Sequence, residues 1–189
     1  MISIRRARPA DSIAIGAVHV AAWRSAYPGI LPDNFLARLS VPRQAAHYDQ
    51  SIRAGVPVFV AAVTGQEALA GTSPRIVGFA TGGPARMAEI GGRGLAEGEI
   101  ETLYVLDDFR ERGVGRRLMR TLAAHLAETG CRSVFVWVLR DNPSRWFYQR
   151  LGGRPVAESC VQVGGQLVNQ TAFVWDPIER LLAASPQAS

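Results

Sequence analysis

The sequence predicts an α/β fold, with a mixed, mostly antiparallel central sheet and helices on both faces. The hydrophobic patterns along the 189 residues read strand, helices, three strands, helix, strand, helix and two strands. Such an order places helices on the faces of a mixed sheet. The strand–helix–strand unit over residues 99–139 should also set two parallel strands side by side through a right-handed crossover. The length fits one domain, expected over residues 1–182, with a disordered tail over 183–189.

The N-terminal part is predicted to hold a strand and three helices. Residues 2–6 have the pattern of a short strand, and Asp11 is placed to cap the helix that follows. Tyr27-Pro28-Gly29 should end that helix, since proline and glycine interrupt helical backbone. Two shorter helices are expected over 32–39 and 42–53.

The rest of the chain alternates between strand and helix signals. Residues 56–63 and 76–82 should pair as a hairpin across a loop, and the glycine-rich stretch 83–98 is expected to be a flexible connection. Asn142-Pro143 has the residues of a helix cap and first helical position, and Leu151-Gly152-Gly153 should end that helix. The remaining segments are strands over 99–105, 133–139, 156–163 and 167–175, and a helix over 114–129.

The composition excludes several kinds of chemistry. The net charge is +5, and all 21 basic residues are arginines. Without lysine there is no Schiff base to pyridoxal phosphate and no Walker-A lysine beneath a triphosphate. Cys131 and Cys160 lie far apart, which disfavours a disulfide framework or a zinc site. His19, His47 and His125 lack the spacing of metal ligands, so no metal is expected.

No targeting or membrane-spanning segment is predicted. No run approaches the ~20 apolar residues that a membrane span needs, and the first residues lack the apolar core of a secretory signal. We therefore expect a cytoplasmic protein without a membrane partner. The arginines are spread along the chain without a recognised nucleic-acid motif, which disfavours a nucleic-acid-binding protein.

The most informative segment runs from Leu103 to Leu118. A strand ends there, and a loop with Gly113 and Gly115 opens a helix. Unpaired backbone N–H groups and the helix dipole make such a helix start an anion site. Both glycines let a phosphate approach the backbone closely, and four arginines add positive charge: Arg110, Arg112, Arg116 and Arg117. The segment therefore predicts a pyrophosphate site.

Two common phosphate-binding motifs do not match this segment. A P-loop requires Gly-Lys-Ser/Thr, and the chain has no lysine. The dinucleotide fingerprint G-x-G-x-x-G requires a third glycine where Leu118 stands, and it usually follows the first strand of its domain. Neither nucleotide-binding class is therefore expected.

The segment resembles the GNAT superfamily of N-acetyltransferases. Arg110, Gly113 and Gly115 match its signature Arg/Gln-x-x-Gly-x-Gly/Ala, and residues 134–153 resemble a second block of the family. The resemblance is close over residues 99–153. It implies a GNAT-like fold and an acetyltransferase that uses acetyl-CoA as co-substrate. The acceptor would be an amine on a small molecule or a peptide.

The resemblance also implies which residues hold the cofactor. Backbone groups of the strand would bind the pantetheine arm, amides of the glycine loop would bind the pyrophosphate, and side chains of the second block would lie near the thioester. The cofactor-binding residues implied in this way are Leu103, Tyr104, Val105, Arg110, Glu111, Arg112, Gly113, Val114, Gly115, Arg116, Asn142, Ser144 and Tyr148.

Candidate catalytic residues lie in the same two blocks. Glu99 and Glu101 are two residues apart, so they should share one strand face, continued by Leu103 and Val105. Glu99 matches the base glutamate of some family members, and Glu101 lies nearer the expected acetyl group. Either can instead be an ordinary polar residue at the mouth of the sheet. By resemblance, Tyr148 is the general acid for the thiolate, or else a packing residue of its helix.

Two aromatic residues are candidates for the acceptor side. Trp23 and Tyr27 are expected to line the acceptor pocket, although Trp23 can equally belong to the core. In the family, a backbone N–H stabilises the oxyanion, and the Val105 amide is the candidate here. The acceptor stays open among polyamines, amino acids, aminoglycosides, peptide N-termini and protein lysines. A homodimer stays open, as does a non-catalytic acyl-CoA sensor.

Overall fold

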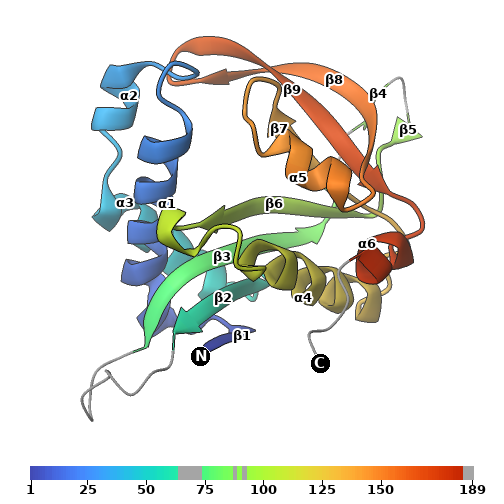
Figure 1. Ribbon diagram of the computed structural model, residues 1–189, viewed down its shortest axis with the longest axis horizontal. Helices are drawn as coiled ribbons and strands as arrows, with labels where there is room; N and C mark the ends of the chain where they lie inside the picture. The colour runs from blue at the N-terminus through green and yellow to red at the C-terminus, as the bar shows by residue number, and fades with distance from the viewer. Residues whose placement is uncertain (64–73, 87–88, 91–92, 185–189) are drawn as a thin grey trace.

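A computed structural model describes residues 1–63, 74–86, 89–90 and 93–184. Within these residues, the main sheet has seven strands in the order β1-β2-β3-β6-β7-β9-β8 (Figure 1). Their bounds are β1 Ile2–Arg6, β2 Val58–Val63, β3 Arg75–Pro84, β6 Gly98–Val105, β7 Val134–Leu139, β8 Arg154–Val163 and β9 Gln166–Trp175. Among the described strands of this sheet, β6 and β7 form the only parallel pair. The mixed, mostly antiparallel sheet is therefore confirmed.

Helices cover both faces of the sheet, as predicted. On one face, α1 (Ser12–Ala26) and α3 (Val41–Arg53) bury Ile15 and Tyr48 against β2 and β3. On the other face, α4 (Val114–Glu128) and α6 (Glu179–Ala184) pack over the same sheet, and α4 lies in front of β3 in Figure 1. The short helices α2 (Asp33–Ala37) and α5 (Arg145–Arg150) lie near the ends of α1 and β7. The described parts include no helix long and apolar enough to cross a membrane.

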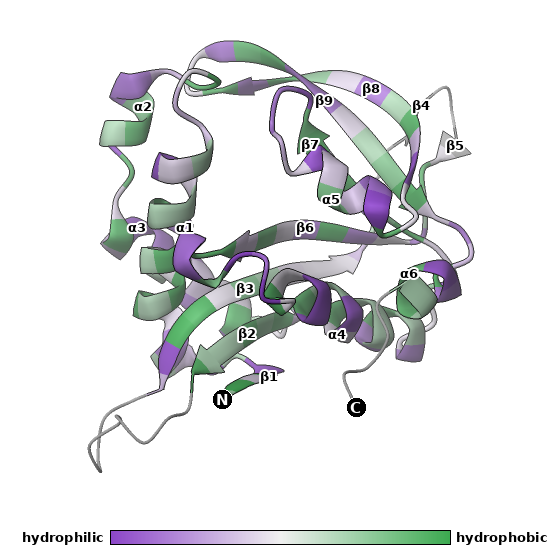
Figure 2. Ribbon diagram, viewed as in Figure 1, coloured by the Kyte–Doolittle hydropathy of each residue, from purple (hydrophilic) through white to green (hydrophobic). Residues whose placement is uncertain are grey.

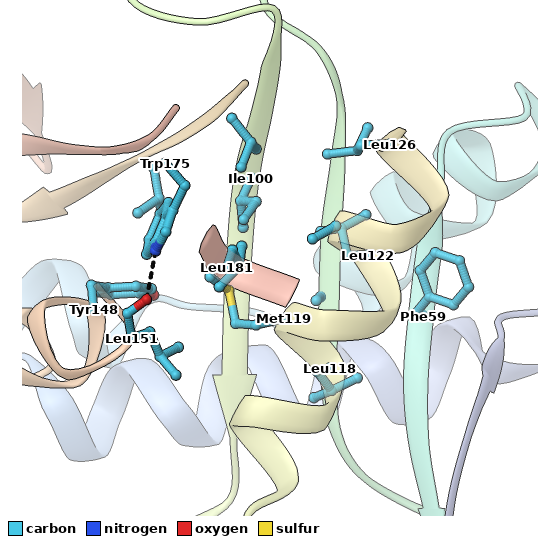
Figure 3. Packing of buried hydrophobic residues seen from close by; sticks show 14 of the residues in the cluster. Phe59, Ile100, Leu118, Met119, Leu122, Leu126, Tyr148, Leu151, Trp175 and Leu181 are labelled. Carbon is cyan, nitrogen blue, oxygen red and sulfur yellow. Dashed lines mark hydrogen bonds between the residues drawn. The ribbon is translucent and has the colours of Figure 1, made fainter. Parts of the chain in front are cut away.

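The sequence of α4 explains its place in the core. Leu118, Leu122 and Leu126 recur at helical spacing and are almost completely buried (Figure 3). The opposite side of α4 carries its hydrophilic residues (Figure 2). Gly113 precedes the helix with a left-handed φ of 76°, a conformation that glycine adopts without strain. The buried leucine stripe thus anchors the helix, and its N-terminus is left at the edge of the sheet.

The start of α5 differs from the prediction. The helix begins at Arg145 and not at Asn142-Pro143. The Asn142 side chain does not cap it; its Oδ1 accepts a hydrogen bond from the Ser144 N–H at 2.9 Å. A side-chain bond to a backbone N–H two residues ahead is the pattern of an Asx turn. The short polar side chain therefore closes a turn before the helix, and the turn delays the first helical residue.

A small two-stranded sheet and one helix were not predicted. Strands β4 (Glu89–Ile90) and β5 (Arg93–Gly94) pair as a small sheet inside the stretch 83–98 expected to be a connection. Helix α6 extends to Ala184, so residues 183–184 are helical although a disordered tail was predicted over 183–189. The rest of that tail, and the loop predicted over 64–74 except its last residue, lie outside the described residues.

Candidate active site

The site lies where the sheet opens between β6 and β7. These parallel strands pair only at Gly98–Ile100 with Val134–Val136, although both continue beyond. The Leu106 N–H donates to the Val77 carbonyl of β3 at 2.9 Å. Because alternate residues of an antiparallel strand bond to the same neighbour, the backbone groups of Leu103 and Val105 point away from β3 and into the opening. Peptide groups are thus available there to a bound molecule.

A cavity of about 800 Å³ fills this opening. It is bounded by the end of α1, by β6 and β7, by the loop before α4 and by the residues around α5. Thirteen of the predicted site residues line it: Tyr27, Glu101, Leu103, Tyr104, Val105, Arg110, Glu111, Gly113, Gly115, Arg116, Asn142, Ser144 and Tyr148. The structure therefore brings the two motif blocks together around one space.

Four predicted site residues lie outside this lining: Trp23, Glu99, Arg112 and Val114. The Val114 side chain is buried in the core beneath α4. The Arg112 guanidinium stands over the Phe109 ring, 5.5 Å from its centroid. Trp23 stacks on His19 and meets Tyr27 edge-on, so it supports the cavity wall from behind.

The prediction that Leu103 and Val105 continue the strand face of Glu99 is wrong. Ile100 packs against the α4 side of the sheet, and so do Leu103 and Val105. In a regular strand the side chains alternate between the two faces, so Ile100 would point away from the side of Leu103 and Val105. The three can share a side only if an extra residue interrupts the alternation between them. The β3–β6 register shows why, because it shifts between Thr81 and Gly82 and leaves Glu101 without a partner. This β-bulge adds one residue, so Leu103 and Val105 do not continue the face of Glu99.

The two carboxylates differ in their surroundings. Glu101 lines the cavity, and its side chain, 28% exposed, lies 3.1 Å from the Arg86 guanidinium. Burial raises the pKa of Glu99, the Glu101 charge adds to the rise, and Arg86 offsets part of it. The pair therefore offers a carboxylate in contact with the cavity, beside a second that holds its proton more tightly.

The loop before α4 has the form of an anion site. Gly113 and Gly115 line the cavity, and the atoms nearest to a Cβ added at Gly115 would be those of the Phe147 ring and Val105, at ordinary contact distances. The Arg110 side chain lies 2.9 Å from the Asp107 carboxylate. Ser25 Oγ donates a hydrogen bond to the same carboxylate. The end of α1 is thus joined through Asp107 to the signature arginine.

Tyr27 and Tyr148 line the cavity, as does a third tyrosine, Tyr104. Tyr148 of α5 is buried and stacks on Phe173, 6.2 Å between ring centroids. Figure 3 shows it beside Trp175, whose indole N–H donates to the Leu151 carbonyl. Tyr27, at the end of α1, accepts a hydrogen bond from Asn142 Nδ2 at 3.3 Å. The Tyr27–Asn142 bond was missed from the sequence, because the two residues are 115 positions apart and no local pattern links them.

Metal ligation finds no support in the same region. Across the part of the chain that the structure describes, no three His, Cys, Asp or Glu side chains are gathered closely enough to hold a metal ion. The residues that line the cavity supply peptide groups, arginines, carboxylates and phenols.

Comparisons with known proteins agree with this geometry. Residues 76–162 match the family model of the FR47-like protein. The chain is 31% identical over 181 residues to the uncharacterized N-acetyltransferase YuaI of Bacillus subtilis, covering 96% of each protein.

Two solved structures have the same fold at lower identity. NAA60 of Arabidopsis thaliana, solved with a bisubstrate analogue, matches with a TM-score of 0.66 and 22% identity over 93% of this chain and 98% of that one. YncA of Salmonella typhimurium, solved with acetyl-CoA, matches with a TM-score of 0.63 and 20% identity over 93% of each chain. Together with the whole-length relative and the family model, they lead to one conclusion: the chain belongs to the GNAT superfamily of N-acetyltransferases.

Proposed function

We propose that the protein transfers the acetyl group of acetyl-CoA to the amine of an acceptor. The observation that carries this proposal is the cavity between β6 and β7, which joins the glycine loop of α4 to Glu101 and Tyr148. One end of this space suits a pyrophosphate, and the other end suits acid–base chemistry. The acetyl-CoA bound by YncA, a protein of the same fold, supports the choice of co-substrate.

The cofactor end would work through backbone groups. Amides at the start of α4 and the helix dipole would hold the pyrophosphate, with Arg110 and Arg116 beside it. The peptide groups of Leu103 and Val105, which face the opening, would bind the pantetheine arm. The Val105 N–H would then lie where negative charge develops on the thioester oxygen, which lowers the barrier to attack.

The chemical end needs a base and an acid. Glu101, directly or through a water molecule, would accept the proton that the amine loses as it attacks. Glu99 lies outside the cavity lining and would act through Glu101. A phenol would protonate the departing thiolate, and the resemblance to the family assigns this step to Tyr148.

The acceptor side is bounded by Tyr27, the end of α1 and Glu101. These groups fit an amine on a small molecule or a peptide, which is also the acceptor class expected from the sequence. NAA60, solved with a bisubstrate analogue, has the same fold. A cytoplasmic location and a homodimer stay predictions from the sequence.

The test is turnover of acetyl-CoA with a panel of amines. The panel holds polyamines, amino acids, aminoglycosides and peptides with free N-termini or lysines, and the released CoA thiol is measured. Thiol release that requires one class of amine supports an acetyltransferase. Saturable acetyl-CoA binding without product from any amine would contradict turnover and support the sensor.

A further inference from the structure

The Asn142 side chain has a fixed orientation, and this orientation decides the role of Tyr27. The Ser144 N–H can only donate, so the Asn142 atom that it meets at 2.9 Å must be the carbonyl oxygen. The amide nitrogen is then the atom that faces Tyr27, at 3.3 Å. Because an amide nitrogen can only donate, the Tyr27 oxygen is the acceptor of this bond. The proton of the Tyr27 hydroxyl is left for another partner.

The Tyr27 side chain that carries this proton lines the cavity. Tyr27 and Asn142 are both buried and both line the cavity. Among the residues that the structure describes, the only hydrogen bond of the Tyr27 hydroxyl is the one it accepts from Asn142. The phenol is therefore preorganised as a donor, with its oxygen held by an N–H group and its proton free for a bound molecule.

We propose that Tyr27 is the phenol that protonates the departing CoA thiolate, ahead of Tyr148, and that Asn142 is its positioning residue. The inference rests on the proposed function. In this step the carbon–sulfur bond of the tetrahedral intermediate breaks and its electron pair goes to sulfur, which takes the Tyr27 proton. The tyrosine oxygen keeps the negative charge beside the Asn142 N–H. The proton that the base removed from the amine returns to Tyr27 through solvent.

Tyr148 lacks the corresponding support. Burial raises the pKa of both phenols, but for Tyr27 the hydrogen bond from Asn142 offsets part of the rise. No such bond to the Tyr148 hydroxyl is found within the described residues, and a charge on Tyr27 further raises the pKa of Tyr148. The two phenols cannot readily ionise together, so the one with a donor at its oxygen ionises first.

The test uses CoA itself as the probe and needs no acceptor. Ultraviolet absorbance of the thiolate is followed against pH in the complex of CoA with the parent protein. A hydrogen-bond donor at the sulfur stabilises the thiolate, so Tyr27→Phe should raise the pKa of the bound thiol by about one unit. Tyr148→Phe should leave it at the parent value. Tyr48→Phe is the control, because it removes a buried phenol hydroxyl outside the cavity lining.

Asn142→Asp gives a second test that preserves the turn. Its carboxylate still accepts from the Ser144 N–H, but it accepts the Tyr27 proton instead of donating to the Tyr27 oxygen. The variant should raise the pKa of the bound thiol as Tyr27→Phe does. In turnover, each change should lower kcat by about 100-fold with little change in the KM for acetyl-CoA. The double variant should be no slower than Tyr27→Phe alone.

The results separate two failures. A parent protein that binds no CoA removes the proposed function, and the inference falls with it. A parent that binds CoA, with a thiol pKa unchanged by Tyr27→Phe, overturns only the inference. If Tyr148→Phe raises the pKa of the bound thiol as much as Tyr27→Phe does, or more, the inference is overturned as well, since Tyr148 would then be the donor.

Discussion

Glu101 occupies the one position of β6 that its neighbour β3 leaves unpaired. The bulge changes the alternation of the strand, and Glu101 reaches the cavity while Glu99 does not. A bulge beside an active site commonly re-aims a side chain in this way. At the scale of single residues, the choice between the two carboxylates therefore depends on strand register.

The rates of two variants test this choice. Glu101→Gln should lower kcat by about 100-fold or more, because a general base contributes at least this much. Glu99→Gln keeps the cavity carboxylate and should have a much smaller effect. Steady-state rates at saturating acetyl-CoA measure both. Equal rates for Glu101→Gln and the parent would exclude Glu101 as the base.

The pKa of Glu99 gives a separate prediction. Burial is the main cause of its rise, followed by the Glu101 charge. Glu99 should therefore stay protonated at a pH where an ordinary glutamate has ionised, and the folded state should favour its neutral form. Glu101→Gln removes one cause of the rise and should lower the pKa of Glu99. Carboxyl carbon NMR titration measures it, and an unchanged pKa would show that the two carboxylates do not interact.

At the scale of elements, the packing of α1 on α3 holds the cavity wall that carries Tyr27. His19 of α1 is buried in this contact, 2.7 Å from the Tyr48 hydroxyl of α3. Burial lowers the pKa of His19 to about 4, and His47 adds to the lowering. Unfolded chains bind a proton at this histidine below about pH 6.5, whereas the folded protein does so only below about pH 4. Stability should therefore fall as the pH is lowered through this window.

Thermal unfolding between pH 7 and 4 tests the His19 prediction. The free energy of unfolding should fall by up to about 1.4 kcal/mol per pH unit from this group alone. His19→Phe should cost about 1 kcal/mol at pH 7, since Tyr48 loses a partner, but it should flatten the dependence on pH. His47→Gln should keep most of the pH dependence, because burial is the larger cause of the lowered His19 pKa. A dependence as steep in His19→Phe as in the parent would assign it to other groups.

At the scale of the molecule, local patterns predicted what local interactions determine. The leucine stripe of α4 and the glycine loop before it need only neighbouring residues, so the helix, the anion site and the parallel β6–β7 pair were predicted. The register between β3 and β6 could not be predicted from the sequence, so the bulge at Glu101 was missed. The Tyr27–Asn142 bond joins distant segments, and Asn142 was taken for a helix cap because the residues of an Asx turn and of a cap are the same.

The central claim is that the start of α4 holds the pyrophosphate of acetyl-CoA. Calorimetric titration with acetyl-CoA tests it in the parent protein and in Gly115→Asp. The helix dipole stabilises an acidic residue in the first turn, and the nearest atoms to a Cβ added at Gly115 lie at ordinary contact distances. The fold should therefore persist while the new charge repels the phosphates. Thr121→Asp adds the same charge further along α4.

We expect one-site binding in the parent and in Thr121→Asp. In Gly115→Asp the affinity should fall by at least ~10-fold. Equal affinity in all three proteins would place the cofactor elsewhere, and no binding in the parent would contradict the acetyltransferase account.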